Sequence, residues 1–269
     1  MRILFLGDVV GRAGRDVVAA ELPRLRERLR TDFVIVNAEN AAGGFGVTRT
    51  VANELFELGI DVLTTGNHWL DQREILTFID SEDRLLRPCN YPKGTPGHGA
   101  GLYTARSGQR VLVVNAMGRV FMDALDDPFA AVDAELNACP LRDVADAVVV
   151  DMHAEATSEK MAMGHFCDGR ASLVVGTHSH VPTADAQIFS GGTAYQTDAG
   201  ACSDYDSVIG MEKEEPIQRF TRKMSSGRMT PASGPGTLCG VYVETDDATG
   251  LARGLEPVRV GGRLKTVIP

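Results

Sequence analysis

The first two-thirds of the chain repeats one unit: a short, continuously apolar run, then a polar or glycine-rich loop, then a helical pattern. Apolar runs that do not alternate with polar residues are typical of strands buried on both faces, as in α/β sheets. We therefore predict an α/β fold in which most of these strands are central. The runs are Ile3–Leu6, Phe33–Val36, Val62–Thr65, Val111–Val114, Ala147–Met152 and Leu173–Val175.

Helices are predicted in the intervals between these runs. Apolar residues recur at helical spacing over Asp16–Leu29, where Pro23 indicates either a kink or a second helix start. A second pattern, Thr50–Leu58, ends before a glycine, as helices commonly do. The pair Asp127-Pro128 has the cap and the proline that open a helix, so we expect one there.

The pattern changes after Gly176, where strands and turns dominate. Thr237–Thr245 and Leu251–Val260 alternate around a loop that ends in Gly250, which predicts a β-hairpin. We expect this part of the chain to form a second, more antiparallel sheet. No internal repeat or long linker is present, so residues 1–269 are predicted to form a single domain.

Charge and composition exclude several classes of protein. With 27 Lys plus Arg against 36 Asp plus Glu, the net charge of -9 disfavours strong binding to nucleic acid or to anionic membranes. No apolar stretch reaches the roughly 18 residues of a membrane span, and no signal peptide is expected. The 5 cysteines are scattered without a CxxC pair, which is typical of a cytoplasmic chain with reduced thiols.

Polar side chains with catalytic or metal-binding chemistry follow five of the six apolar runs. The carboxyl ends of parallel strands converge on one rim of an α/β sheet, where ligands bind, so we expect these residues to meet. Asp8 follows the first run, Glu39 and Asn40 the second, Asn67 and His68 the third, His153 the fifth, and His178 and His180 the sixth.

Carboxylate, amide and imidazole groups without thiolates suit iron, manganese or zinc at a hydrolytic site. His178 and His180 alternate along a segment expected to be extended, so they would point in different directions and serve two metals better than one. Glu39 can bridge two ions about 3.5 to 4 Å apart, a spacing that activates a shared water for attack at phosphorus. The pattern therefore favours phosphoester hydrolysis.

Four short segments in this order resemble the signature of calcineurin-like metallophosphoesterases: Gly7-Asp8, Gly66-Asn67-His68, His153 and the GTHSH run at 176–180. The longer stretches at 7–15, 37–44 and 196–213 are similar to the bacterial YmdB-type branch, whose members hydrolyse cyclic nucleotides, notably 2′,3′-cyclic ones. The resemblance implies a four-layer αββα sandwich, with two mixed sheets flanked by helices and a binuclear metal centre at the rim. It also suggests self-association.

The resemblance implies a role for each strand-end residue. Asp8, Glu39, Asn40 and His180 would hold one metal, and Glu39, Asn67, His153 and His178 would hold the other. Two ions per chain are therefore expected, iron first and manganese as the alternative. His68 would protonate the leaving oxygen, and we propose Asp71 as its orienting partner. The first motif departs from the usual Asp-x-His because Val10 stands at its third position, and Glu39 replaces the usual bridging Asp.

The expected activity is hydrolysis of a small cyclic nucleotide by attack of a metal-bridging hydroxide, with 2′,3′-cyclic substrates favoured over 3′,5′-cyclic ones. Phe45 and Trp69 are the nearby candidates for stacking on a base. Two alternatives stay open. The fold and the metals do not determine whether a phosphodiester or a phosphomonoester is hydrolysed, so the chain could be a phosphomonoesterase. It could also be a metal-stabilised regulatory protein that binds a nucleotide without turnover.

Overall fold

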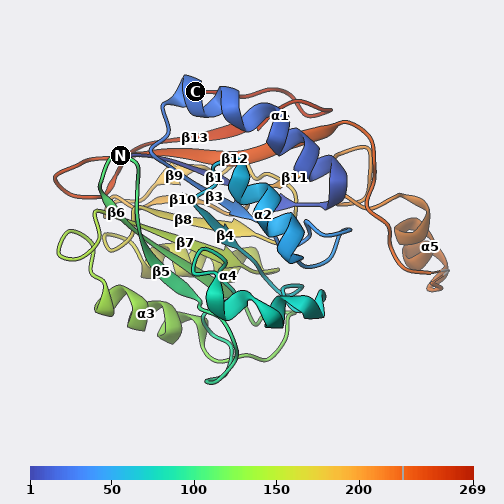
Figure 1. Ribbon diagram of the computed structural model, residues 1–269, viewed down its shortest axis with the longest axis horizontal. Coiled ribbons are helices and arrows are strands. Elements are labelled where there is room, and N and C mark those ends of the chain that lie inside the picture. Colours follow the sequence, from blue (N-terminus) through green and yellow to red (C-terminus); the bar gives the residue numbers. More distant parts are fainter. Residues whose placement is uncertain (226) are drawn as a thin grey trace.

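The computed structural model describes residues 1–225 and 227–269 (Figure 1). Its helices in these ranges are α1 (Gly11–Leu29), α2 (Arg49–Glu57), α3 (Pro128–Ala138), α4 (Thr157–Phe166) and α5 (Glu214–Arg222), with short 3-10 segments η1 (Arg73–Thr77) and η2 (Ile79–Ser81). None of the described helices combines the length and the apolar character needed to cross a membrane.

The strands form two mixed sheets. The first has the order β2-β11-β12-β1-β3-β4, with β13 paired to β12, and the second has the order β5-β6-β7-β8-β10-β9. The first sheet contains β1 (Arg2–Leu6), β2 (Asp8–Val9), β3 (Phe33–Asn37), β4 (Val62–Thr64), β11 (Ala201–Asp204), β12 (Gly236–Thr245) and β13 (Ala252–Val260). The second contains β5 (Ala100–Thr104), β6 (Arg110–Met117), β7 (Ala147–His153), β8 (Leu173–Thr177), β9 (Gln187–Ile188) and β10 (Ala194–Gln196).

The predicted apolar runs are divided between these sheets. In the first sheet β1, β3 and β4 are parallel, and in the second β6, β7 and β8 are parallel. The prediction of a separate C-terminal sheet is wrong. The β12–β13 hairpin itself is confirmed. However, β12 joins the first sheet and pairs antiparallel with β1, from Arg2↔Glu244 to Leu6↔Gly240. It thereby covers the edge of β1 that does not pair with β3.

Alternate side chains of the central strands enter different cores, which explains why the runs are apolar throughout. Phe5 and Ile35 of the first sheet share a core with Val113 of the second, so the two sheets pack face to face. Their neighbours Leu4 and Val34 point the other way, into a core with α1. Each fully buried side chain of this size contributes roughly 1.5–3 kcal/mol relative to exposure, so both faces matter.

Helices cover the outer faces of the two sheets. Apolar residues of α1 and α2 pack on the first sheet, and Val132 of α3 and Met163 of α4 pack on the second. Figure 1 shows α1 and α3 on opposite sides of the stacked strands, with α5 set apart at one end. The helix at Asp127-Pro128 is confirmed, and Asp127 caps it by accepting a hydrogen bond from the Phe129 N–H.

Helix α1 differs from its prediction in two respects. It begins at Gly11, five positions before Asp16, because glycine and alanine in its first turn hide the apolar pattern. The chain also remains helical through Pro23, which lies on the exposed side, so the second helix start suggested by this proline does not occur.

Candidate metal centre

The strand-end residues come from both sheets and meet at one edge of the sandwich. Because the sheets are stacked, the carboxyl ends of β1, β3 and β4 lie beside those of β7 and β8. Asp8 opens β2 directly after β1, Glu39 and Asn40 follow β3, Asn67 and His68 follow β4, His153 ends β7, and His178 and His180 follow β8.

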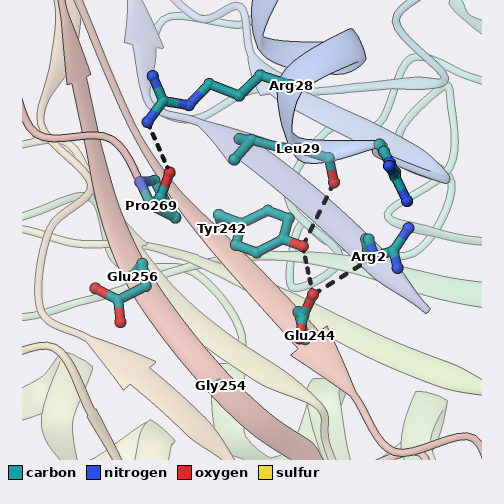
Figure 2. Close-up of a pocket in the computed structure, with 9 residues that line it drawn as sticks. Arg2, Arg28, Leu29, Tyr242, Glu244, Gly254, Glu256 and Pro269 are labelled. Carbon is teal, nitrogen blue, oxygen red and sulfur yellow. Dashed lines mark hydrogen bonds and ion pairs between the residues drawn. The ribbon is translucent and has the colours of Figure 1, made fainter.

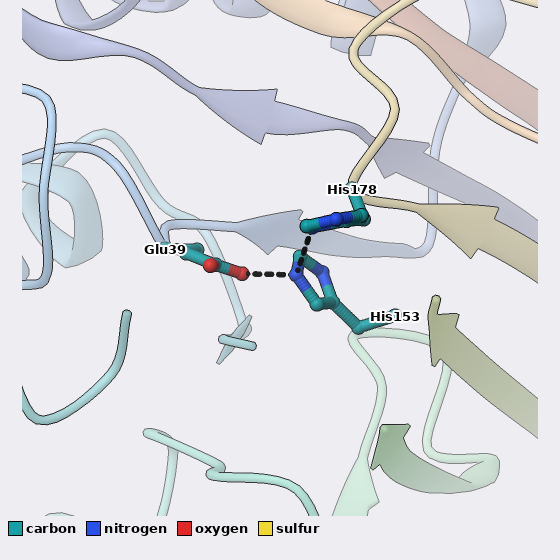
Figure 3. Close-up of side chains that lie close together, drawn as sticks. All are labelled: Glu39, His153 and His178. Atoms are coloured by element: carbon teal, nitrogen blue, oxygen red, sulfur yellow. Dashed lines mark hydrogen bonds and ion pairs between the residues drawn. The ribbon is translucent and has the colours of Figure 1, made fainter. Parts of the chain in front are cut away.

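Glu39, His153 and His178 form the closest group (Figure 3), with ligand atoms that all lie within 4.8 Å of one another. Glu39 Oε2 is 2.6 Å from His153 Nε2, and His178 Nδ1 is 3.1 Å from the same nitrogen. One carboxylate from the first sheet therefore faces two imidazoles from the second.

Further predicted residues surround this group. Asn67 Oδ1 lies 3.0 Å from His153 Nε2. Asp8 Oδ1 lies 3.7 Å from His153 Nδ1 and 3.9 Å from His180 Nε2, while Asp8 Oδ2 accepts a hydrogen bond from the His178 backbone N–H at 3.2 Å. The structure thus places Asp8, Asn67 and His180 beside this group.

The hydrogen bonds of His153 fix which of its nitrogens carries the proton. Thr177 donates its hydroxyl proton to Asp151 Oδ1 at 2.7 Å, so its oxygen must accept from His153 Nδ1, 2.9 Å away. His153 Nε2 is then an unprotonated nitrogen aimed at Glu39. Such a hydrogen-bonded chain behind the ligand is how proteins orient a metal-binding histidine.

The other two imidazoles are held in the same way. His178 Nε2 lies 3.1 Å from Glu155 Oε2, and His180 Nδ1 lies 2.7 Å from the Ile209 carbonyl oxygen. Both oxygens only accept hydrogen bonds here, so these nitrogens carry the protons. The lone pairs of His178 Nδ1 and His180 Nε2 are therefore free to face the centre.

Several buried oxygens at this edge have no hydrogen-bond donor. Among the described residues, buried atoms without a hydrogen-bond donor include Asp8 Oδ1, Glu39 Oε2 and Asn40 Oδ1. The Asn40 amide nitrogen donates to the Gly44 carbonyl at 2.9 Å, which turns the amide oxygen the other way. Buried acceptors without donors are costly, but cations satisfy them together with the imidazole lone pairs. The donor set therefore fits metal ions.

The electrostatics of the site also fit cations. Burial raises the pKa of Asp8 well above its usual value, and the carboxylates of Asp198 and Glu39 raise it further. Burial likewise raises the pKa of Glu39, lowers the pKa of His153 well below its usual value and lowers the pKa of His178 to about 3. The lowered pKa values of His153 and His178 favour their neutral forms, as ligation requires, and a bound cation would offset the desolvation of the carboxylates.

The space around Gly66 explains why a glycine precedes Asn67 and His68. A Cβ at this position would fall on Glu39 Oε2 and on the His153 ring. Any side chain here would push apart the carboxylate and the imidazole that face each other, so the position requires glycine.

His68 lies at the open side of the site. Its backbone N–H donates to Glu39 Oε1 at 2.9 Å, while its ring Nδ1 lies 2.9 Å from Asp71 Oδ2, as proposed for this pair. The Phe45 ring packs edge-on against it at 5.1 Å between centroids. Trp69 is wrong as a stacking candidate because it is only 1% exposed and packs against Tyr91 in the interior.

The expectation that His178 and His180 alternate along an extended strand is also wrong. Strand β8 ends at Thr177, and the two histidines adopt φ of 94° and 64°. Polar supporting residues were missed as well, among them Asp151 and Asn37, whose side chains bond to each other at 2.9 Å. The sequence feature that could have indicated them is a polar residue inside a continuously apolar run, as for Asp151, or directly after one, as for Asn37.

A pocket elsewhere in the molecule does not belong to this site (Figure 2). It has a volume of about 450 Å³ and includes Arg2, which begins β1, whereas Asp8 lies beyond the other end of that strand. Its polar groups contact one another: Arg2 lies 3.5 Å from Glu244, and the Tyr242 hydroxyl donates to Glu244 at 2.7 Å.

Stacked mixed sheets with carboxylates, amides and histidines at their shared carboxyl edge define the metallophosphoesterase class. The family model described as "YmdB-like protein" matches residues 4–258. The chain is 45% identical over 260 residues to the 2′,3′-cyclic-nucleotide 2′-phosphodiesterase of Bacillus subtilis (strain 168), with 97% of each chain covered. The chain therefore belongs to the YmdB-like family.

Solved structures agree with this assignment. A hypothetical protein from Thermus thermophilus matches with a TM-score of 0.90 and 42% identity, covering 98% of this chain and 100% of that one. A phosphatase from Mycoplasma pneumoniae matches with a TM-score of 0.90 and 32% identity, covering 97% of this chain and 93% of that one.

The hydrogen bond between Thr177 and His153 gives a direct test of the site. Thr177→Val keeps the shape of the side chain but removes the hydroxyl, so His153 loses its orienting acceptor. We expect the affinity for Mn²⁺ to fall by about 10- to 100-fold, measured by calorimetric titration of chelator-treated protein. Thr177→Ser retains the hydroxyl and should bind like the wild-type protein. Equal affinity in the Val variant would contradict the role assigned to this hydrogen bond.

Proposed function

We propose that this chain is a metal-dependent phosphodiesterase that hydrolyses cyclic nucleotides, with 2′,3′-cyclic nucleotides preferred over 3′,5′-cyclic ones. The observation that supports the proposal is that, among the residues the structure describes, Asp8 Oδ1 and Glu39 Oε2 are buried without a hydrogen-bond donor and lie beside three imidazole lone pairs. The name of the B. subtilis relative supports the choice of substrate.

In this proposal two metal ions share Glu39. Asp8, Asn40 and His180 complete one ligand set, and Asn67, His153 and His178 complete the other. Iron is the expected metal and manganese the alternative, because both accept imidazole together with carboxylate ligands. When bound, such ions supply positive charge for the phosphate and lower the pKa of a coordinated water.

The residues of the chain divide the remaining work. Asp71 accepts from His68 Nδ1 and so presents the opposite nitrogen of the ring toward a departing ribose oxygen. The carboxylates of Asp8 and Glu39 would offset part of the charge of bound metals. This balance favours a monoanionic diester over a dianionic monoester. A strained five-membered cyclic phosphate is the diester that opens most easily.

The proposal extends to the architecture and setting of the protein. The cores between the sheets and beneath the helices support a four-layer αββα sandwich formed by residues 1–269 as one domain. Self-association and a cytoplasmic location stay predictions from the sequence.

The role of His68 can be separated from metal binding. His68→Ala keeps the backbone N–H that holds Glu39, so both metals and the KM should be retained. We expect kcat to fall by about 10²- to 10⁴-fold, as for a lost general acid. The loss should be smaller with a p-nitrophenyl ester, whose leaving group needs no proton. If metal analysis showed that this variant had lost an ion, His68 would be a ligand and the assigned role would be wrong.

The substrate class is tested by steady-state kinetics at matched metal occupancy. We expect kcat/KM to be highest for 2′,3′-cyclic AMP, lower for 3′,5′-cyclic AMP and bis-p-nitrophenyl phosphate, and very low for nucleoside monophosphates. A higher kcat/KM for a monoester would identify a phosphomonoesterase instead. Tight binding of a nucleotide with no product formed over hours would indicate a regulatory protein.

A further inference from the structure

Two of the predicted metal ligands lie on backbone that side chains rarely adopt. His178 has φ of 94° and His180 has φ of 64°, both in the region that favours glycine. Backbone of this kind persists only where its surroundings hold it in place. Contacts outside the His178-Ser179-His180 segment must therefore keep the two imidazoles directed toward the candidate metal centre.

Ser179, between the two histidines, is held by a buried carboxylate. Asp198 Oδ2 accepts from the Ser179 backbone N–H at 3.0 Å and from its hydroxyl at 2.7 Å. The other oxygen of Asp198 accepts from the Gly200 N–H at 2.8 Å. Beyond the histidines, the Thr183 N–H donates to the Asp198 carbonyl at 3.1 Å. Asp198 thus holds the middle of the segment and also the chain three residues beyond its end.

A buried lysine completes this arrangement. Lys160 projects from α4, is fully buried, and places Nζ 2.8 Å from Asp198 Oδ2 and 3.0 Å from the Ser179 hydroxyl oxygen. Lysine is almost never fully buried unless it is paired. A buried ion pair is weak support for stability, since apolar residues of similar volume often stabilise as well or better. The pair therefore calls for a role other than stability.

We propose that Lys160 and Asp198 are positioning residues. Their hydrogen bonds to Ser179 hold His178 and His180 in the orientation needed to bind metal. Both act through Ser179, which contributes no predicted ligand atom. The inference rests on the proposed function, because the metal centre is part of it, and adds two residues that the ligand sets do not contain.

A double variant separates positioning from stability. Lys160→Met or Asp198→Asn alone leaves a buried charge unpaired and should lower the Tm sharply. Together they remove both charges, keep the volume and leave the net charge unchanged, so the Tm should recover. The hold on Ser179 stays weakened, because methionine cannot donate to the Ser179 hydroxyl oxygen and the single amide oxygen of asparagine serves either Ser179 or Gly200. We expect the double variant to bind Mn²⁺ about 10- to 100-fold more weakly than the wild-type protein.

The control is Ser172→Ala at the opposite end of β8. Ser172 accepts from the Val148 N–H at 3.0 Å and donates to the Gly250 carbonyl, so its loss should lower the Tm without changing the affinity for Mn²⁺. Calorimetric titration of chelator-treated proteins measures the affinities. Wild-type affinity in the double variant, or an equal loss in Ser172→Ala, would overturn the positioning role. Failure of the wild-type protein to bind Mn²⁺ would overturn the proposed function as well.

Discussion

The site depends on hydrogen-bond acceptors, namely carboxylate oxygens and imidazole nitrogens, that lie close together at the edge shared by the two sheets. In the part of the chain that the structure describes, Asp8 Oδ1 and Glu39 Oε2 have no hydrogen-bond donor, and imidazole nitrogens lie within 4 Å of them. Acceptors packed together in a protein interior repel one another, and bound cations would relieve this repulsion. The proposed chemistry follows from this arrangement.

The surroundings of the site preserve this concentration of acceptors. Gly66 leaves room for Glu39 beside His153, and Thr177 with Asp151 fixes the proton on the far side of that ring. Lys160 and Asp198 extend the same principle to the backbone of the His178-Ser179-His180 segment. Each contact removes an orientation in which a ligand atom would turn away or carry a proton, so the site is organised before metal arrives.

The sequence predicted the strands, the hairpin and the meeting of strand-end residues, because continuous apolar runs report burial and polar residues directly after them report the strand ends. It did not predict which strands pair, because β1 with β12 and β1 with β3 are equally compatible with a run buried on both faces. The positive φ of His178 and His180 was also missed, since it depends on Asp198, which lies far along the chain. Trp69 was wrongly predicted to contact a base because the sequence alone does not show whether an aromatic residue next to a predicted metal ligand lines the site or packs in the core.

The proposed function requires this edge of the sheets to bind two cations, with Glu39 in both ligand sets. The most direct measurement is a crystal structure grown with excess Mn²⁺, with data collected at a wavelength where manganese scatters anomalously. We expect two anomalous peaks beside the Glu39 carboxylate, the first near His180 and the second near His153 and His178. A single peak, or none, would contradict it.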